Sequence, residues 1–380
     1  MSLKNIFIIA RDFPGAGGRN TFICNLLDNF RERYNFKIIS WNQKDKKYLV
    51  KKRFFKLPTL SLFFFYLQSF FVLYKLNRKK KIDIIFSTGL SGLGGIFFGR
   101  IFKIPVFLST SGYRGSLVKS KKKDLSDYSY SYASNKGHML EKLKKYFLVK
   151  TYTAFLRVQF DKYSLYLSDK VFLPSNFNII DLKARGADLR KINYYVIQEG
   201  AKPKYSEYSP EFIKAKLNLD NTKKIISFAR IDNLQTISDI YKNLCKEYNL
   251  IFIMSDRVAF FENKSLTAVN IKIEDVFQIT DLLVVPPAQE PHSSTVLEAL
   301  FLKIPTLVSK VDWLADEFHE FPELFISDLS VRGITERISF AMSNYDLVTK
   351  KSRAASKAIL GKYNIDKMYK KYNSFFESIK

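Results

Sequence analysis

The stretch DLLVVPPAQEPHSSTVLEAL, residues 281–300, contains the pattern that decides the fold of the chain. Its apolar run 282–285 predicts a buried strand, and the two prolines that follow predict the end of that strand. A polar turn comes next, and then a helix whose cap is Ser293 or Ser294. The first N–H groups of a helix lack partners and its dipole is positive there, so this turn is a predicted anion-binding site.

Two carboxylates accompany this turn. Glu290 lies in the turn itself, and Glu298 lies eight residues later, more than one turn into the helix. Each can accept hydrogen bonds from a ligand with several hydroxyl groups. For two isolated glutamates, the simpler interpretation is a solvated loop and helix surface.

The same strand, turn and helix order recurs along the chain. Strands that are apolar on both faces and alternate with helices predict doubly wound parallel sheets. Residues 199–210 are polar, contain two prolines and separate two sets of α/β units. We therefore expect two facing Rossmann-like domains with a cleft between them, residues 1–203 and 204–363. The polar stretch 119–137 is a predicted mobile loop and a candidate substrate gate. The predicted strands are 4–10, 36–41, 82–87, 104–110, 170–174, 193–198, 223–229, 249–255, 281–287 and 305–309.

Composition excludes several classes of protein. The 380 residues are 47% hydrophobic, which excludes a disordered or collagen-like chain. Only two cysteines occur, without metal-type spacing, which excludes a disulfide framework and a zinc site. The formal net charge of +26 predicts an anionic partner: nucleic acid, a membrane surface or a phosphorylated ligand. The first residues contain no apolar run long enough for a secretory signal, so we expect a cytoplasmic protein.

Much of the positive charge surrounds one apolar segment. From Trp41 to Lys81 there are twelve Lys or Arg residues and one acid, Asp45, and residues 57–73 carry no charge. Seventeen residues fall short of the ~20 that span a bilayer, so the segment predicts a helix that lies in the membrane interface. Together with the flanking cations, residues 44–81 predict a contact with an anionic membrane surface. The alternative is a core helix with solvated lysines. No nucleic-acid-binding pattern accompanies the basic residues, and nucleic acid is not an expected partner.

The motif E-x7-E after a D-x-x-V-x-P strand resembles the donor-binding signature of retaining glycosyltransferases with the GT-B fold, especially glycosyltransferase family four. The resemblance implies that Glu290 is a catalytic carboxylate facing the donor sugar and that Glu298 binds the nucleotide ribose. It also implies that the turn faces the donor diphosphate, with His292, Ser293, Ser294 and Thr295.

Other segments extend the resemblance over nearly the whole chain. Gly17 and Gly18 in PGAGGRNTF look like the glycine-rich turn after the first strand, which approaches the donor. Arg230 in KKIISFARIDN looks like the arginine that binds the diphosphate and stabilises the leaving group. The closing helix, 364–380, resembles the one that returns to the N-terminal, acceptor-side domain.

Three positions depart from the family pattern. Gln235 stands where a second diphosphate cation is usual, and Ser111, followed by Gly112, stands where a histidine contacts the donor sugar. Met254 replaces a glycine after a strand of the second domain. These departures keep a catalytically silent partner subunit or glycan-binding protein open as the alternative function.

The resemblance implies a metal-independent retaining hexosyltransferase without a cofactor. We expect two substrates. The donor is a nucleotide diphosphate sugar, taken as the UDP form, and the acceptor is a glycan, lipid-linked, used in bacterial surface polysaccharide synthesis. We expect the protein at the inner face of the plasma membrane. No D-x-D metal motif occurs in the sequence. A sugar-nucleotide epimerase and a basic nucleic-acid binder are further alternatives.

Overall fold

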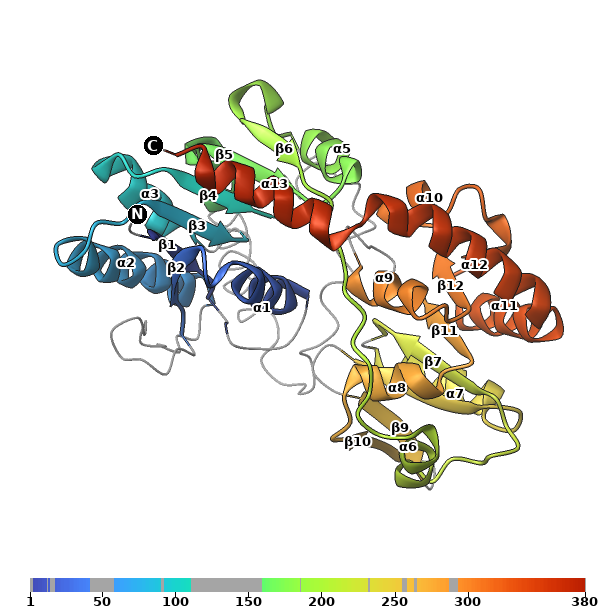
Figure 1. The fold of residues 1–380 in the computed structure, drawn as a ribbon. Coiled ribbons are helices and arrows are strands. Elements are labelled where there is room, and N and C mark those ends of the chain that lie inside the picture. Colours follow the sequence, from blue (N-terminus) through green and yellow to red (C-terminus); the bar gives the residue numbers. More distant parts are fainter. Residues whose placement is uncertain are drawn as a thin grey trace, which may run out of the picture. The chain divides into compact units, whose positions relative to one another are not determined.

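The computed structural model describes most of the chain and divides it into two compact units (Figure 1). The first unit comprises Met1–Gly15, Ile23–Ile197 and Phe375–Lys380, and the second comprises Ala16–Phe22 and Gln198–Ser374. The described residues are 3–11, 13, 18–41, 58–89, 92–110, 159–184, 186–231, 233–254, 258–262, 265–286 and 293–379.

The first unit contains a parallel sheet in the order β2-β1-β3-β4-β5-β6. Consecutive strands are joined through helices, as the alternation of apolar runs and helical segments predicts. The sequence prediction of these strands is confirmed, with ends shifted by a few residues. The strands are β1 (Lys4–Ile9), β2 (Tyr34–Ile39), β3 (Ile84–Thr88), β4 (Val106–Ser109), β5 (Lys170–Leu173) and β6 (Tyr194–Val196).

Helices cover both faces of this sheet. On one face, α2 (Pro58–Asn77) and α3 (Leu93–Phe102) pack on a core that includes Phe7, Ile9 and Ile85. The end of the chain packs on the opposite face, where the ring of Phe376 contacts Phe86, Phe107 and the α1 residue Phe30. The remaining helices of this unit for which bounds are given are α1 (Gly18–Phe30) and α5 (Asn176–Ala184).

The second unit contains a mixed sheet in the order β10-β9-β8-β7-β11-β12-β13. Strands β7, β8, β11, β12 and β13 are parallel, whereas β9 pairs antiparallel with both β8 and β10. This hairpin is absent from the strands predicted from the sequence. Its two strands are short and joined by only two residues, which suits an antiparallel pair and leaves no room for a helical crossover. The strands are β7 (Ile225–Ala229), β8 (Asn249–Ile253), β9 (Val258–Glu262), β10 (Ser265–Val269), β11 (Leu282–Val285), β12 (Thr306–Ser309) and β13 (Phe325–Ile326).

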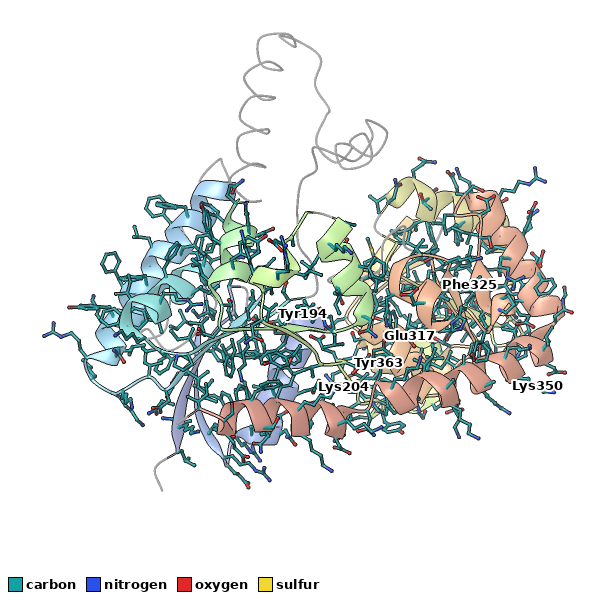
Figure 2. The ribbon with its side chains drawn as sticks, turned by 90° about the horizontal axis from the view of Figure 1, so that it is seen from above. Tyr194, Lys204, Glu317, Phe325, Lys350 and Tyr363 are labelled. Carbon is teal, nitrogen blue, oxygen red and sulfur yellow. The ribbon has the colours of Figure 1, made fainter. Side chains whose placement is uncertain are left out.

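A buried polar network stabilises the end of α12 in this unit. The Trp313 Nε1–H donates to the hydroxyl of Tyr363 at 2.5 Å, and that hydroxyl donates to Glu317 at 2.9 Å (Figure 2). Both aromatic side chains are 1% exposed, so these hydrogen bonds lie in the core and satisfy polar atoms that water does not reach. The helices are α6 (Pro210–Lys216), α7 (Leu234–Leu244), α8 (Ile273–Ile279), α9 (Ser294–Phe301), α10 (Asp312–Glu317), α11 (Val331–Ser343), α12 (Tyr345–Lys362) and α13 (Ile365–Glu377).

Some sequence predictions fall outside the described residues. The predicted gating loop 119–137 is one of them. Of the helix predicted to follow it, residues 159–167 are described and are helical. None of the helices in the described ranges combines the length and the apolar character needed to cross a bilayer.

Candidate functional site

The sheet of the second unit reverses its winding direction between β7 and β11. From β7 the chain passes through α7 to β8 on one side, and from β11 it passes through α9 to β12 on the other. The two strands are direct neighbours, with Leu282 opposite Ile226 and Val284 opposite Phe228. In doubly wound sheets, the carboxyl ends of the strands at such a reversal form the ligand-binding crevice.

Arg230 follows directly after β7 at this edge of the sheet. Its φ of 66° is left-handed, which costs a residue with a side chain roughly 1 to 2 kcal/mol. Its backbone N–H donates to the carbonyl of Ile253 at 3.2 Å, so the left-handed turn stays attached to the neighbouring strand β8. The residue is exposed. A strained backbone that presents a cation at a ligand-binding edge is a feature typical of functional sites.

The N-terminus of α9 lies at the same edge, because the helix follows β11. Ser293 caps the helix: its Oγ accepts a hydrogen bond from the N–H of Val296 at 3.4 Å, and its side chain is buried. This cap confirms the predicted start of the helix. Ser294 and Thr295 form the first turn, whose N–H groups have no acceptor within the helix. The turn therefore offers both N–H donors and the positive end of a helix dipole to an anion.

Glu298 is a partly buried carboxylate one turn further along α9. Burial raises its pKa to about 7, the charge of Lys204 opposes this shift, and the charge of Glu274 adds to it. Within the described residues, its carboxyl group makes no hydrogen bond or ion pair. A carboxylate held in this way is destabilised when ionised, and a ligand that donates hydroxyl hydrogen bonds would relieve that cost.

Gln235 lies in the first turn of α7, which follows β7. Its backbone N–H is capped by Asn233 Oδ1 at 2.9 Å, and its side-chain amide donates to both carboxyl oxygens of Asp239, at 2.9 Å each. The side chain is neutral and is held within its own helix. It adds no positive charge to this edge of the sheet.

The structure brings Arg230, Gln235 and the α9 residues Ser293, Ser294, Thr295 and Glu298 to one edge of one unit. Gly18 is the first residue of α1. The other predicted site residues lie outside the described residues: Gly17, Ser111, Gly112, Glu290 and His292.

Sequence reasoning missed Lys204 and Glu274, the two charges that act on Glu298. Lys204, labelled in Figure 2, lies in the segment between β6 and α6, and Glu274 lies in the first turn of α8. No local motif marks either residue, since their relation to Glu298 arises from the packing of segments that are distant in sequence. In the described ranges, no three or more His, Cys, Asp or Glu side chains gather in a way that could hold a metal ion.

Comparisons with known proteins identify the fold. No protein-family model matches the chain, and no curated protein matches it. Among solved structures, sucrose-phosphate synthase from Thermosynechococcus elongatus superposes with a TM-score of 0.69 at 12% identity, covering 98% of each chain. HepE from Anabaena, in complex with UDP and glucose, has a TM-score of 0.65 at 10% identity, covering 99% of this chain and 100% of its own. WaaG, a glycosyltransferase involved in lipopolysaccharide biosynthesis, has a TM-score of 0.63 at 12% identity, covering 98% of this chain and 100% of its own.

These likenesses extend over almost the full length of each chain and agree with the two α/β units and their parallel-dominant sheets. These three solved structures are GT-B glycosyltransferases. This chain has the GT-B fold.

Proposed function

We propose that this chain is a retaining, metal-independent glycosyltransferase that transfers a hexose from a nucleotide diphosphate sugar to a glycan acceptor. The observation that carries the proposal is the partly buried carboxylate of Glu298, which lies one turn beyond the N-terminus of α9 at the winding reversal of the second sheet. Two neighbouring ribose hydroxyls match a carboxylate that makes no hydrogen bond or ion pair within the described residues. A diphosphate matches the adjacent N–H groups and the cation of Arg230.

In this proposal, the second unit binds the donor and stabilises its leaving group. When the bond between the anomeric carbon and the diphosphate oxygen breaks, negative charge grows on the diphosphate. The N–H groups of Ser294 and Thr295 and the guanidinium of Arg230 are then the groups that stabilise this charge. Glu290 would face the sugar, as the resemblance to family four implies, and the first unit would contact the acceptor, with Ser111 and Gly112.

The UDP form is our first candidate for the donor, because HepE was solved with UDP and glucose. For the acceptor we propose a lipid-linked oligosaccharide in bacterial surface polysaccharide synthesis, at the inner face of the plasma membrane. This choice is supported by the similarity to WaaG, a glycosyltransferase involved in lipopolysaccharide biosynthesis. The net charge of +26 favours an anionic surface in the same way.

The test is calorimetric titration of the purified chain with UDP, GDP, ADP and UDP-glucose. We expect saturable binding of one nucleotide series. Glu298→Gln should weaken it by about 1.5 to 3 kcal/mol, the range for hydrogen bonds to a charged group. Glu320→Gln is the matched control, because that side chain is 67% exposed in the same unit and should leave affinity unchanged. Equal affinities of the wild type and Glu298→Gln would remove Glu298 from the site.

The second candidate function is a catalytically silent partner subunit or glycan-binding protein. Gln235 favours it, because this neutral side chain is held by Asp239 and brings no cation to the diphosphate side. Transfer of labelled sugar from the bound nucleotide to an acceptor extract, by the purified chain alone, would exclude the silent protein. Conversion of the free donor without acceptor would instead identify an epimerase.

A further inference from the structure

Large apolar side chains are exposed along two neighbouring helices of the first unit. Those on α2 recur at intervals of four, four and three residues and thus share one side of the helix. Those on α3 form a second row. All are between 38% and 63% exposed, and we call them the α2–α3 face: Phe63, Leu67, Phe71, Tyr74, Phe97, Ile101 and Phe102.

The two rows form one continuous surface. Helix α2 joins β2 to β3 and helix α3 joins β3 to β4, and these three strands are parallel members of one sheet, so the two helices run in the same direction across it. The rings of Tyr74 and Phe102 are 5.9 Å apart, which connects the exposed rows. The helices also pack closely, since a Cβ added to Gly94 would lie 2.0 Å from the carbonyl oxygen of Tyr66. Contiguous apolar surface of this kind marks an interaction site.

The charged residues of the segment that carries this face are mostly basic. Residues 58–110 contain seven Lys or Arg residues and one acid, Asp83, which accepts the backbone N–H of Asn5 at 2.8 Å. Because the helices are parallel, their basic C-terminal ends lie at the same edge of the sheet. Arg100 is paired with Asp169 at 3.1 Å. The exposed cations that follow the two helices are Arg78, Lys79, Lys80, Lys81 and Lys103.

We propose that the α2–α3 face is the surface by which this protein lies on an anionic lipid bilayer. The apolar side chains enter the boundary between headgroups and acyl chains, and the cations at the helix ends contact lipid phosphates. A second copy of the chain is a poor occupant, because a symmetric dimer would place two sets of like charges together. The inference specifies the membrane contact of the proposed function, adds α3 to the segment predicted from the sequence, and uses no residue of the donor site.

The experiment is flotation of the purified full chain with vesicles of phosphatidylcholine alone or with about one third phosphatidylglycerol. We expect the wild type to float only with the anionic vesicles, and less as salt rises. The double variant Phe71→Ser, Ile101→Ser should lose at least tenfold in vesicle affinity. Ile180→Ser is the matched control: it lies on α5, is 61% exposed against 63% for Ile101, and should float as the wild type does.

A second variant tests the charge separately. Lys79→Gln with Lys80→Gln should lower affinity for anionic vesicles severalfold and reduce its dependence on salt. The proposal is overturned if the wild type does not float, or if the Phe71, Ile101 variant floats unchanged. It is also overturned if sedimentation shows a dimer that this variant dissociates. UDP binding is measured in parallel on the same variants, so loss of vesicle binding with intact nucleotide binding separates this inference from the donor proposal.

Discussion

Nucleotide binding should depend on pH through Glu298. The pKa of this carboxyl group is raised to about 7 in the free protein, mainly by burial. If two ribose hydroxyls donate to it, the ionised form is favoured in the complex and the pKa falls on binding. Binding then releases a proton whenever the pH is below about 7. The dissociation constant should therefore rise as pH falls, towards tenfold for each pH unit.

The expected magnitude follows from the pKa of the free protein. At pH 7.5 most of the carboxyl groups are ionised, and at pH 5.5 only about one in thirty is ionised. The dissociation constant should therefore rise roughly 25-fold between these pH values, about 2 kcal/mol, if the complex stays ionised throughout.

The assay is titration calorimetry with UDP at half-unit steps of pH, repeated in two buffers of different ionisation enthalpy to count released protons. The phosphate of the nucleotide itself titrates near pH 6. Glu298→Gln controls for this, because the variant retains the phosphate effect and loses the carboxyl effect. Parallel pH profiles for the wild type and the variant would refute the reasoning.

The same pKa predicts the stability of the free protein. A glutamate whose folded pKa lies above its unfolded value binds more protons in the native state. The free energy of unfolding should then fall as pH rises from about 4.5 to 7, by about 1 to 3 kcal/mol. In urea unfolding, the free energy of unfolding of the Glu298→Gln variant should not fall over this pH range.

Further substitutions test the contribution of single residues to binding and stability. Lys204→Gln should raise the pKa of the donor-site carboxyl group and move the midpoint of the binding profile to higher pH, because Lys204 opposes the shift due to burial. Arg230→Gly should raise the free energy of unfolding by about 1 kcal/mol, because glycine adopts a φ of 66° without strain, and it should also weaken UDP binding. A lower free energy of unfolding would contradict the argument that the backbone of Arg230 is strained. Gly94→Ala should lower the free energy of unfolding by about 1 to 3 kcal/mol, because the added methyl group overpacks the contact between α2 and α3. At Gly361 an added Cβ meets nothing within 4 Å, so Gly361→Ala should stabilise α12 by up to about 1 kcal/mol. Equal effects of the two substitutions would contradict the packing argument.

The sequence by itself determined the two α/β units and the start of α9. Apolar runs such as 282–285 form buried strands wherever helices cover both faces, and Ser293 caps a helix through a bond within its own turn. These signals are local, so the sequence could predict them. The hairpin β9–β10 was not predicted, because short apolar runs without strict alternation do not indicate whether a strand pairs parallel or antiparallel.

The tertiary structure alone decided the environment of the site and the exposure of the helices. Arg230 and the N-terminus of α9 share one edge because β7 and β11 are neighbours, although about fifty residues separate these strands. The pKa of Glu298 depends on burial and on charges from two distant segments. Likewise, the sequence predicted an apolar helix at 57–73, but the packing of α3 against α2 determined which side chains remain exposed. Burial and long-range electrostatics depend on the whole packed chain, whereas strands and caps depend on a few neighbouring residues.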